Sequence, residues 1–287
     1  PAGGAILPQL LEKEYYTLGK AANYSVSRIS GLVGYMLAGG VIALIGAVGA
    51  LWIDAATFLI SSAIIWSIRY KENLQGAKQT VKGVIQDSAE GFRFIRASRT
   101  IQTVSLIGLL INFGIMPLTV FQTPYVSDYL KMGPETLSYI KILTSVGMIT
   151  GSALLPKLGK IKTPVIAVAA GVIMGAALIE MSIAQSLSTP VLKMGILTLS
   201  MLSIGFGGGL LNVVIGSSVM KAVPKEMMGR ISGFLTAMMQ ASMPVASFIC
   251  SALAVYFHIP HILVFFGSLT LICSLALYFR KKLDALS

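Results

Sequence analysis

Long apolar stretches separated by short polar connections dominate this sequence of 287 residues. A helix needs about 20 mostly apolar residues to cross the hydrocarbon core of a bilayer, and backbone amides in lipid must bond within their own segment. Barrel strands would be shorter and would alternate in polarity, so they do not fit. Eight stretches satisfy the helical requirement, and we predict a transmembrane helix for each: Ser27–Ala47, Ala50–Ile68, Ile101–Tyr125, Thr136–Leu155, Pro164–Ile183, Val191–Val219, Ile231–Tyr256 and Ile259–Phe279.

Composition excludes an ordinary soluble domain. Only 11% of the residues are charged while 55% are hydrophobic, whereas about a quarter of a soluble chain is charged. The predicted fold class is therefore an all-α membrane protein, a polytopic helical bundle with the lipid bilayer as its first partner. The two cysteines, Cys250 and Cys273, lie in apolar stretches and cannot form a disulfide framework. The sequence shows no metal-ligand spacing, and we expect neither a metal nor a cofactor.

The basic residues are distributed unevenly between the connections. The net charge of +11 alone would suggest nucleic acid as a partner. When the connections are assigned alternately to two sides of a membrane, however, all but Lys131, Lys141 and Lys193 of the 22 basic residues fall on one side. Because basic connections stay in the cytoplasm, we predict a multi-pass protein of the cell membrane with both ends of this chain cytoplasmic, and no nucleic-acid partner.

One long polar stretch divides the chain into three parts. Within Tyr70–Thr100 the apolar residues recur at helical spacing, which predicts an amphipathic helix on the cytoplasmic membrane surface: Val81, Val84, Ile85, Phe92 and Ile95. The predicted domains are residues 1–69 with two spans, the connector 70–100, and residues 101–287 with six spans.

Four segments carry recognisable motifs. The stretch Gly31–Gly40 has glycines at Gly31, Gly34, Gly39 and Gly40, with Tyr35 in the position of a motif proline. The other segments are Ile53–Ser62 with Asp54, Leu154–Lys160 with Gly159, and Asn212–Phe234 with Pro224, Gly229 and Arg230. Together with Glu90–Arg96, they resemble the macrolide-efflux-like drug:proton antiporter branch of the major facilitator superfamily.

The resemblance implies a fold and a position within it. The eight spans would correspond to helices five to twelve of that fold, so that the chain, which begins at Pro1, would be a fragment lacking the first four helices. The resemblance also implies a bacterial transporter that works as a monomer. The glycines at 31, 34, 39, 40, 159 and 229, with Pro224 and Arg230, would serve gating or packing.

In this family the first helix of each three-helix repeat lines a central cavity, here the third and sixth spans. The residues that we predict to line it are Asn112, Phe113, Gln122, Asn212, Ser217 and Gln240. For the amides the alternative is hydrogen bonding between helices, worth about 0.6 kcal/mol per bond. We favour cavity lining for Asn112 and Asn212.

Charged residues inside spans are candidates for proton or charge coupling. Asp54 either binds a proton or caps its helix near the outer interface, and we favour the cap. Lys141 either pairs with a carboxylate or extends to the outer surface, and both alternatives stay open. We interpret Arg28 as a cytoplasmic anchor, Glu180 as interfacial, and His258 with His261 as solvated turn residues rather than metal ligands.

The predicted function follows from these features and from the resemblance. The spans hold no cluster of catalytic side chains, so we expect no enzyme activity. The expected function is secondary active transport, namely proton-coupled efflux of small amphipathic compounds or drugs by alternating access, with a small molecule and protons as partners. The alternative is a membrane scaffold or an inactive fragment that transports nothing.

Overall fold

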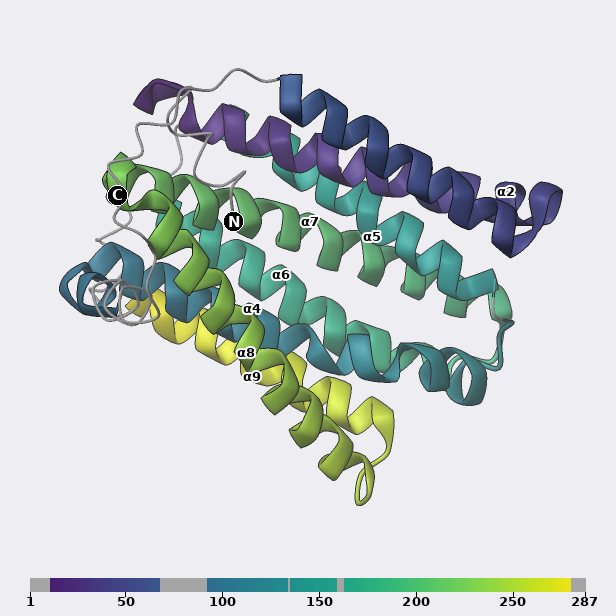
Figure 1. Cartoon of the computed structure of the whole chain (residues 1–287). Helices are drawn as coiled ribbons and strands as arrows, with labels where there is room; N and C mark the ends of the chain where they lie inside the picture. Colours follow the sequence, from purple (N-terminus) through teal and green to yellow (C-terminus); the bar gives the residue numbers. More distant parts are fainter. Residues whose placement is uncertain (1–10, 68–91, 134, 159–162, 280–287) are drawn as a thin grey trace. The chain divides into compact units, whose positions relative to one another are not determined.

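The structure is a computed structural model that describes residues 11–67, 92–133, 135–158 and 163–279. All the regular elements in these ranges are helices (Figure 1). Short 3₁₀ or π helices carry the label η. In chain order the elements are η1 Lys13–Tyr15, α2 Tyr16–Ser67, α4 Arg99–Pro124, η2 Tyr125–Tyr129, α5 Glu135–Leu154, η3 Leu155–Leu158, α6 Thr163–Ile183, η4 Ala184–Ser186, α7 Pro190–Ala222, η5 Lys225–Met227, α8 Met228–Ala254 and α9 Ile259–Phe279.

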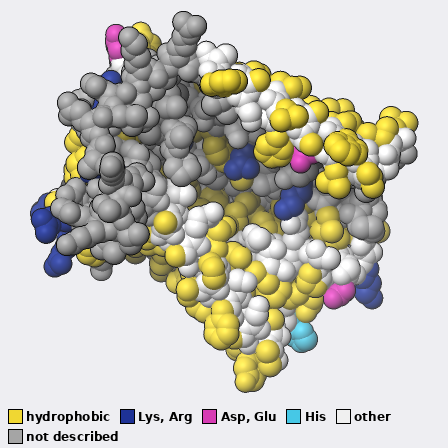
Figure 2. Space-filling view, in the orientation of Figure 1, with side chains coloured by type: hydrophobic (Ala, Val, Ile, Leu, Met, Phe, Trp, Pro, Cys, Tyr) yellow, Lys and Arg dark blue, Asp and Glu magenta, His cyan; other side chains and the backbone are white. Residues whose placement is uncertain are grey.

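Six helices within the described ranges are long and apolar enough to cross a membrane. They are α4 to α9, and they match the last six predicted spans to within about three residues at each end. The all-helical membrane fold predicted from the sequence is therefore confirmed. Hydrophobic side chains spread over much of the surface that Figure 2 describes, as expected where lipid is the solvent.

The helix α2 covers both of the first two predicted spans and turns at Gly46 (Figure 1). This glycine has φ 72° and ψ 172°, a backbone conformation that is essentially restricted to glycine. The sequence predicted the break between residues 47 and 50, slightly later in the chain. Beyond the turn, Val48–Ile64 forms an apolar helix of its own.

The chain forms two compact units. One comprises Ile29–Gln86, and the other comprises Pro1–Arg28 with Asp87–Ser287. The start of α2 thus belongs to the same unit as α4 to α9, because Tyr16, Ala21 and Tyr24 are buried there. The three sequence domains predicted at 1–69, 70–100 and 101–287 divide the chain differently and stay a prediction.

Glycines allow α5 and α7 to approach closely. Gly147 and Gly151 of α5 lie against the backbone of α7, while Gly205 and Gly209 of α7 lie against the backbone of α5. Each pair is spaced by four residues, so each presents one smooth strip of helix surface. Two such strips pack face to face, as small residues do where helices must associate without a hydrophobic driving force.

Glycines also lie at other helix contacts of this unit. Helix α6 packs on α7 and α9, and Gly175 of α6 faces Gly267 of α9. Helix α4 packs on α7, α8 and α9, where Gly108 contacts Met239 and Gly114 contacts Thr270. The helices α4 to α9 thus form one bundle, in which α7 packs on α4, α5 and α6.

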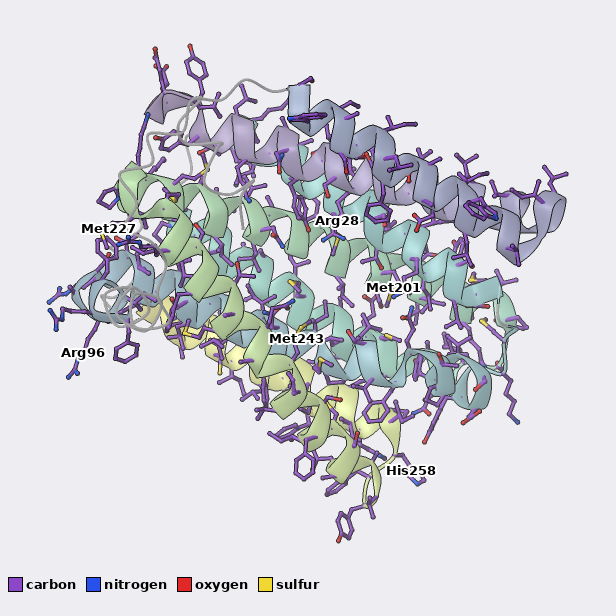
Figure 3. All side chains as sticks on the ribbon, in the orientation of Figure 1. Arg28, Arg96, Met201, Met227, Met243 and His258 are labelled. Carbon is purple, nitrogen blue, oxygen red and sulfur yellow. The ribbon has the colours of Figure 1, made fainter. Side chains whose placement is uncertain are left out.

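Labelled residues mark the two ends of the bundle. Arg96 and Met227 lie at one end and His258 at the other (Figure 3). Only the last part of the predicted amphipathic connector is described: residues 92–97 are helical, with Ile95 buried and Arg96 exposed. The rest of that prediction, including Val81, Val84 and Ile85, lies outside the described residues.

Candidate functional site

Three amide side chains lie within three apolar helices, two of them near the middle and the third nearer the C-terminal end of its helix. Asn112 belongs to α4, Asn212 to α7 and Gln240 to α8, and α4 packs against both of the other helices. Asn212 and Gln240 are exposed, and Asn112 is half-buried. A polar group at this depth is expensive in hydrocarbon, so exposed amides there are expected to face protein or a water-filled cavity.

Asn112 also joins two helices. Its Nδ2 donates a hydrogen bond of 3.3 Å to the carbonyl oxygen of Met239, which also accepts a bond of 2.6 Å from Ser242 Oγ. Met239 lies shortly before Pro244, which has no backbone N–H to donate to the carbonyl one turn earlier in α8. The contact is the one expected from the interhelical alternative, and cavity lining by Asn112 stays a prediction.

The other predicted cavity residues lie in three different environments. Phe113 packs on Phe266 of α9, with ring centroids 5.2 Å apart. Gln122 is half-buried towards the far end of α4. Ser217 is buried within the bundle, and its hydroxyl donates to the carbonyl of Val214 in its own helix at 3.2 Å. None of these placements brings the three side chains to one point.

The candidates for charge coupling are both exposed. Asp54 of α2 accepts, at its backbone carbonyl, a 2.7 Å bond from the hydroxyl of Thr57. Lys141 lies on α5, with Ser145 bonded to its backbone carbonyl at 2.8 Å. They belong to different compact units, so their pairing stays a prediction.

Glu180 is more involved in packing than the sequence suggested. It is half-buried at the end of α6, where the hydroxyl of the fully buried Ser200 donates to its Oε2 at 3.4 Å. The contact joins α6 to α7. The only sequence signal was a single carboxylate close to the end of a span, which does not tell which neighbour it faces.

The motif residues occupy several environments. A Cβ added to Gly31 or Gly34 would meet nothing within 4 Å. Gly39 and Gly40 are helical, and Gly159 lies outside the described residues. Pro224, Gly229 and Arg230 are exposed where α7 gives way to η5 and α8. Their gating role stays a prediction.

The two histidines stand at the end of the bundle opposite Arg96. Both are exposed, with ring centroids 6.1 Å apart, and Nδ1 of His258 lies 3.5 Å from the Tyr129 hydroxyl. That hydroxyl also accepts a 3.4 Å bond from the backbone of Ile259. Within the described part of the chain, no three His, Cys, Asp or Glu side chains come together as a metal site would require.

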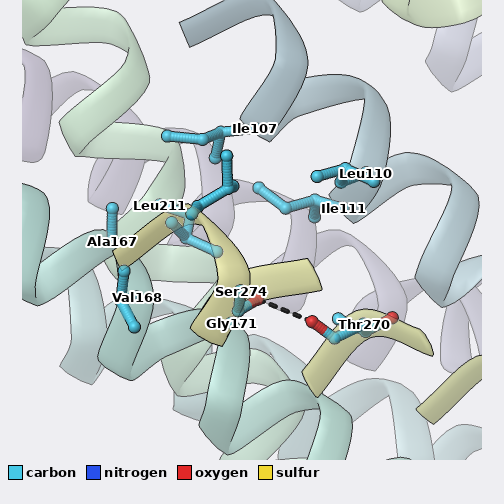
Figure 4. A pocket seen from close by; sticks show the side chains of 10 residues that line it. Ile107, Leu110, Ile111, Ala167, Val168, Gly171, Leu211, Thr270 and Ser274 are labelled. Carbon is cyan, nitrogen blue, oxygen red and sulfur yellow. Dashed lines mark hydrogen bonds between the residues drawn. The ribbon is translucent and has the colours of Figure 1, made fainter. Parts of the chain in front are cut away.

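A small cavity lies among α4, α6, α7 and α9 (Figure 4). Its volume is about 20 Å³, enough for about one water molecule. Most of its lining is apolar, and the hydroxyls of Thr270 and Ser274 are already bonded to backbone carbonyls of their own helix at 2.8 and 2.7 Å. This cavity is too small for a substrate.

A larger apolar hollow of about 640 Å³ lies between α8 and α9. It is lined by Leu253, Phe257, His261, Ile262 and Phe265, and both phenylalanines are exposed. This lining fits acyl chains of the surrounding lipid and offers a polar ligand few groups to bind.

Comparisons with known proteins agree with this architecture. Residues 1–247 match the model of the Major Facilitator Superfamily. The chain is also similar to the "Uncharacterized MFS-type transporter YvqJ" of Bacillus subtilis (strain 168), with 24% identity over 179 residues, which is 61% of this chain and 42% of that relative. The match thus spans less than half the length of the relative. The family consists of membrane transporters rather than enzymes, in agreement with the expectation from the sequence. With its membrane helices and this match, the chain belongs to the Major Facilitator Superfamily.

Proposed function

We propose that the protein containing this chain is a secondary active transporter that exports small amphipathic compounds in exchange for protons by alternating access. The observation that carries the proposal is the set of amides within the apolar helices α4, α7 and α8, two of them exposed. Amides within membrane helices can form hydrogen bonds with the polar part of a ligand, while apolar side chains of the cavity wall contact the apolar part of the ligand.

The finer family position rests on the motifs in the sequence. We assign the described helices to the macrolide-efflux-like antiporter branch, with α2 as helices five and six and α4 to α9 as helices seven to twelve. The match of residues 1–247 to the superfamily model supports membership of the superfamily, within which we make this assignment of helices. The transporter would act as a monomer.

Orientation follows from charge. The bundle end with Arg96 would be cytoplasmic, as would both ends of this chain, in the plasma membrane of a bacterium. A single cysteine placed at Lys225 should react with a membrane-impermeant maleimide only after permeabilisation, and one at His258 should react in intact cells. The reverse pattern would overturn the orientation.

Proton coupling requires an acid whose protonation changes the balance between inward-open and outward-open states. Asp54 is the first candidate for this acid, and Lys141 is the second charged residue proposed to take part in coupling. The test compares Asp54→Asn with Asp54→Glu, since only a proton-carrying role is restored by glutamate. Uncoupler-sensitive efflux that survives unchanged in Asp54→Asn would remove this residue from the mechanism.

Efflux from everted membrane vesicles tests the function itself. Cells producing the protein should give dye transport that collapses on adding an uncoupler. Asn212→Ala and Gln240→Ala should reduce transport several-fold at equal membrane expression, while the matched amide control Gln185→Ala, in η4 at the end of α6, should not. Transport that is insensitive to the uncoupler would contradict proton antiport, and equal loss in all three variants would contradict the cavity assignment.

A further inference from the structure

One face of the first turns of α2 carries two cations and a phenol. Lys20, Tyr24 and Arg28 are spaced by four residues, so they form a single stripe along the helix. This part of α2 belongs to the same compact unit as α4 to α9, and it precedes the first predicted span, Ser27–Ala47. We call these three residues the basic stripe.

The stripe is held against α5 and α7. Ser25, beside it, shares a 2.7 Å hydrogen bond with the hydroxyl of Ser152 in α5. Since the Ser152 hydroxyl also donates to the carbonyl of Ile149 at 2.9 Å, the Ser25 hydroxyl supplies the proton between the two serines. The segment is thus tied to the bundle by a defined polar contact as well as by the buried Tyr16.

The stem of Lys20 occupies a notch in α7. A Cβ added to Gly216 would overlap the Lys20 Cε and lie 2.9 Å from its Cδ and Cγ. The missing side chain at Gly216 therefore admits the lysine stem. Burial lowers the pKa of Lys20 from its usual value, because the charged ammonium is partly removed from water.

Every polar head group in the stripe has a hydrogen to donate. The Arg28 guanidinium also acts on the oxygen of Tyr24, but the structure gives the hydroxyl hydrogen of Tyr24 no acceptor. The ammonium of Lys20 and the guanidinium of Arg28 can only donate, and neither is paired with a carboxylate among the described residues. The Arg28 guanidinium lies over the Tyr24 ring, 4.9 Å from its centroid, yet the buried Tyr24 hydroxyl has no hydrogen-bond partner. Tyr24 is only 9% exposed, so bulk water replaces that partner poorly.

Such a set of donors is chemically complementary to an oxyanion. We propose that the basic stripe binds the carboxylate or phosphate group of an anionic ligand, with Lys20 and Arg28 supplying charge and Tyr24 supplying a directed hydrogen bond. Charge-assisted bonds from lysine, arginine and tyrosine are the usual means of holding such groups. The inference goes beyond the proposed export and does not depend on it, because a bound lipid headgroup would satisfy the same donors as a free anion.

Two arms of one experiment distinguish the sources. The purified protein is placed in nanodiscs of zwitterionic phosphatidylcholine and titrated with inorganic phosphate, with chloride at equal ionic strength as reference, and the thermal unfolding temperature is followed. In parallel, nanodiscs containing phosphatidylglycerol are analysed by native mass spectrometry for retained lipid. A free-anion site gives saturable stabilisation by phosphate, and a headgroup site gives retained phosphatidylglycerol.

Substitutions in the basic stripe test whether the phosphate or lipid signal comes from this site. Lys20→Met keeps the apolar stem in the Gly216 notch and removes only the charge, while Tyr24→Phe removes one hydroxyl. We expect either to weaken the phosphate or lipid signal about tenfold, the loss of one charge-assisted hydrogen bond. The controls Arg96→Gln and Tyr256→Phe change exposed residues elsewhere and should leave the signal unchanged.

The outcomes that overturn the proposal are equally specific. The stripe does not bind an oxyanion if neither phosphate nor phosphatidylglycerol gives a signal with the unmodified protein. It also fails if the signal falls equally in the control variants, because the attraction is then a diffuse effect of positive charge. Both readouts measure binding, so a failure of the efflux assay would leave this result standing.

Discussion

Replacing Gly205 by alanine tests the close packing of α5 on α7. A Cβ on Gly205 would overlap the carbonyl oxygen of Thr144 and lie 3.0 Å from the backbone nitrogen of Met148. Both neighbours are backbone atoms, so they cannot turn aside as a side chain would. Overpacking of this kind costs up to about 3 kcal/mol, and the better helix propensity of alanine returns about 1 kcal/mol. We therefore expect a net loss of about 2 kcal/mol.

The same helix provides the matched control. A Cβ on Gly195, also in α7, would meet nothing within 4 Å, so Gly195→Ala should be neutral or stabilise the protein by up to about 1 kcal/mol. Thermal unfolding in mild detergent can be followed with a thiol-reactive dye, since Cys250 is fully buried until the bundle opens.

On the scale of soluble domains of this size, the midpoint should fall by about 4–8 °C for Gly205→Ala and should not fall for Gly195→Ala. The two substitutions differ only in position along one helix. Equal shifts in the two variants, in either direction, would refute the interlocking of the two glycine strips.

Three further changes have defined outcomes. Gly46→Ala places a side chain where φ is 72° and should destabilise the turn of α2 by about 1–3 kcal/mol, measured by thermal unfolding. Tyr125→Phe removes the hydrogen bond that its buried hydroxyl donates to the carbonyl of Met181, and should cost about 1–2 kcal/mol, while the exposed Tyr256→Phe should cost nothing measurable. Glu180→Gln should leave the pH profile of efflux unchanged, because the side chain joins two helices; an altered profile would make Glu180 a coupling residue.

The helices were predictable because their signals are local. Length and hydropathy located α4 to α9, and residues such as Ser98 and Pro190 mark where helices begin. The hydroxyl of Ser98 accepts a 3.4 Å bond from the backbone of Ile101, and Pro190 opens α7. The turn in α2 lies at Gly46, slightly before the predicted break, because several glycines in that region could form a turn.

Which side of each helix is buried and which side meets lipid was much harder to predict. In a membrane protein the lipid face and the buried face are both apolar, so periodicity does not reveal which side a residue faces. Ser217 illustrates this, since it proved buried and bonded to its own helix. Arg28 was interpreted as a cytoplasmic anchor, and the structure adds that its guanidinium lies over the ring of Tyr24, one turn earlier in α2.

Water accessibility near mid-helix tests the central claim most directly. Single cysteines are placed at Asn212 and Gln240, and at the apolar position Phe248 of α8, which is also exposed, in a protein carrying Cys250→Ala and Cys273→Ala. A hydrophilic thiol reagent needs water to generate the reactive thiolate. The polar cavity predicts rapid labelling at Asn212 and Gln240 and little at Phe248; labelling that is equally slow at all three positions would contradict it.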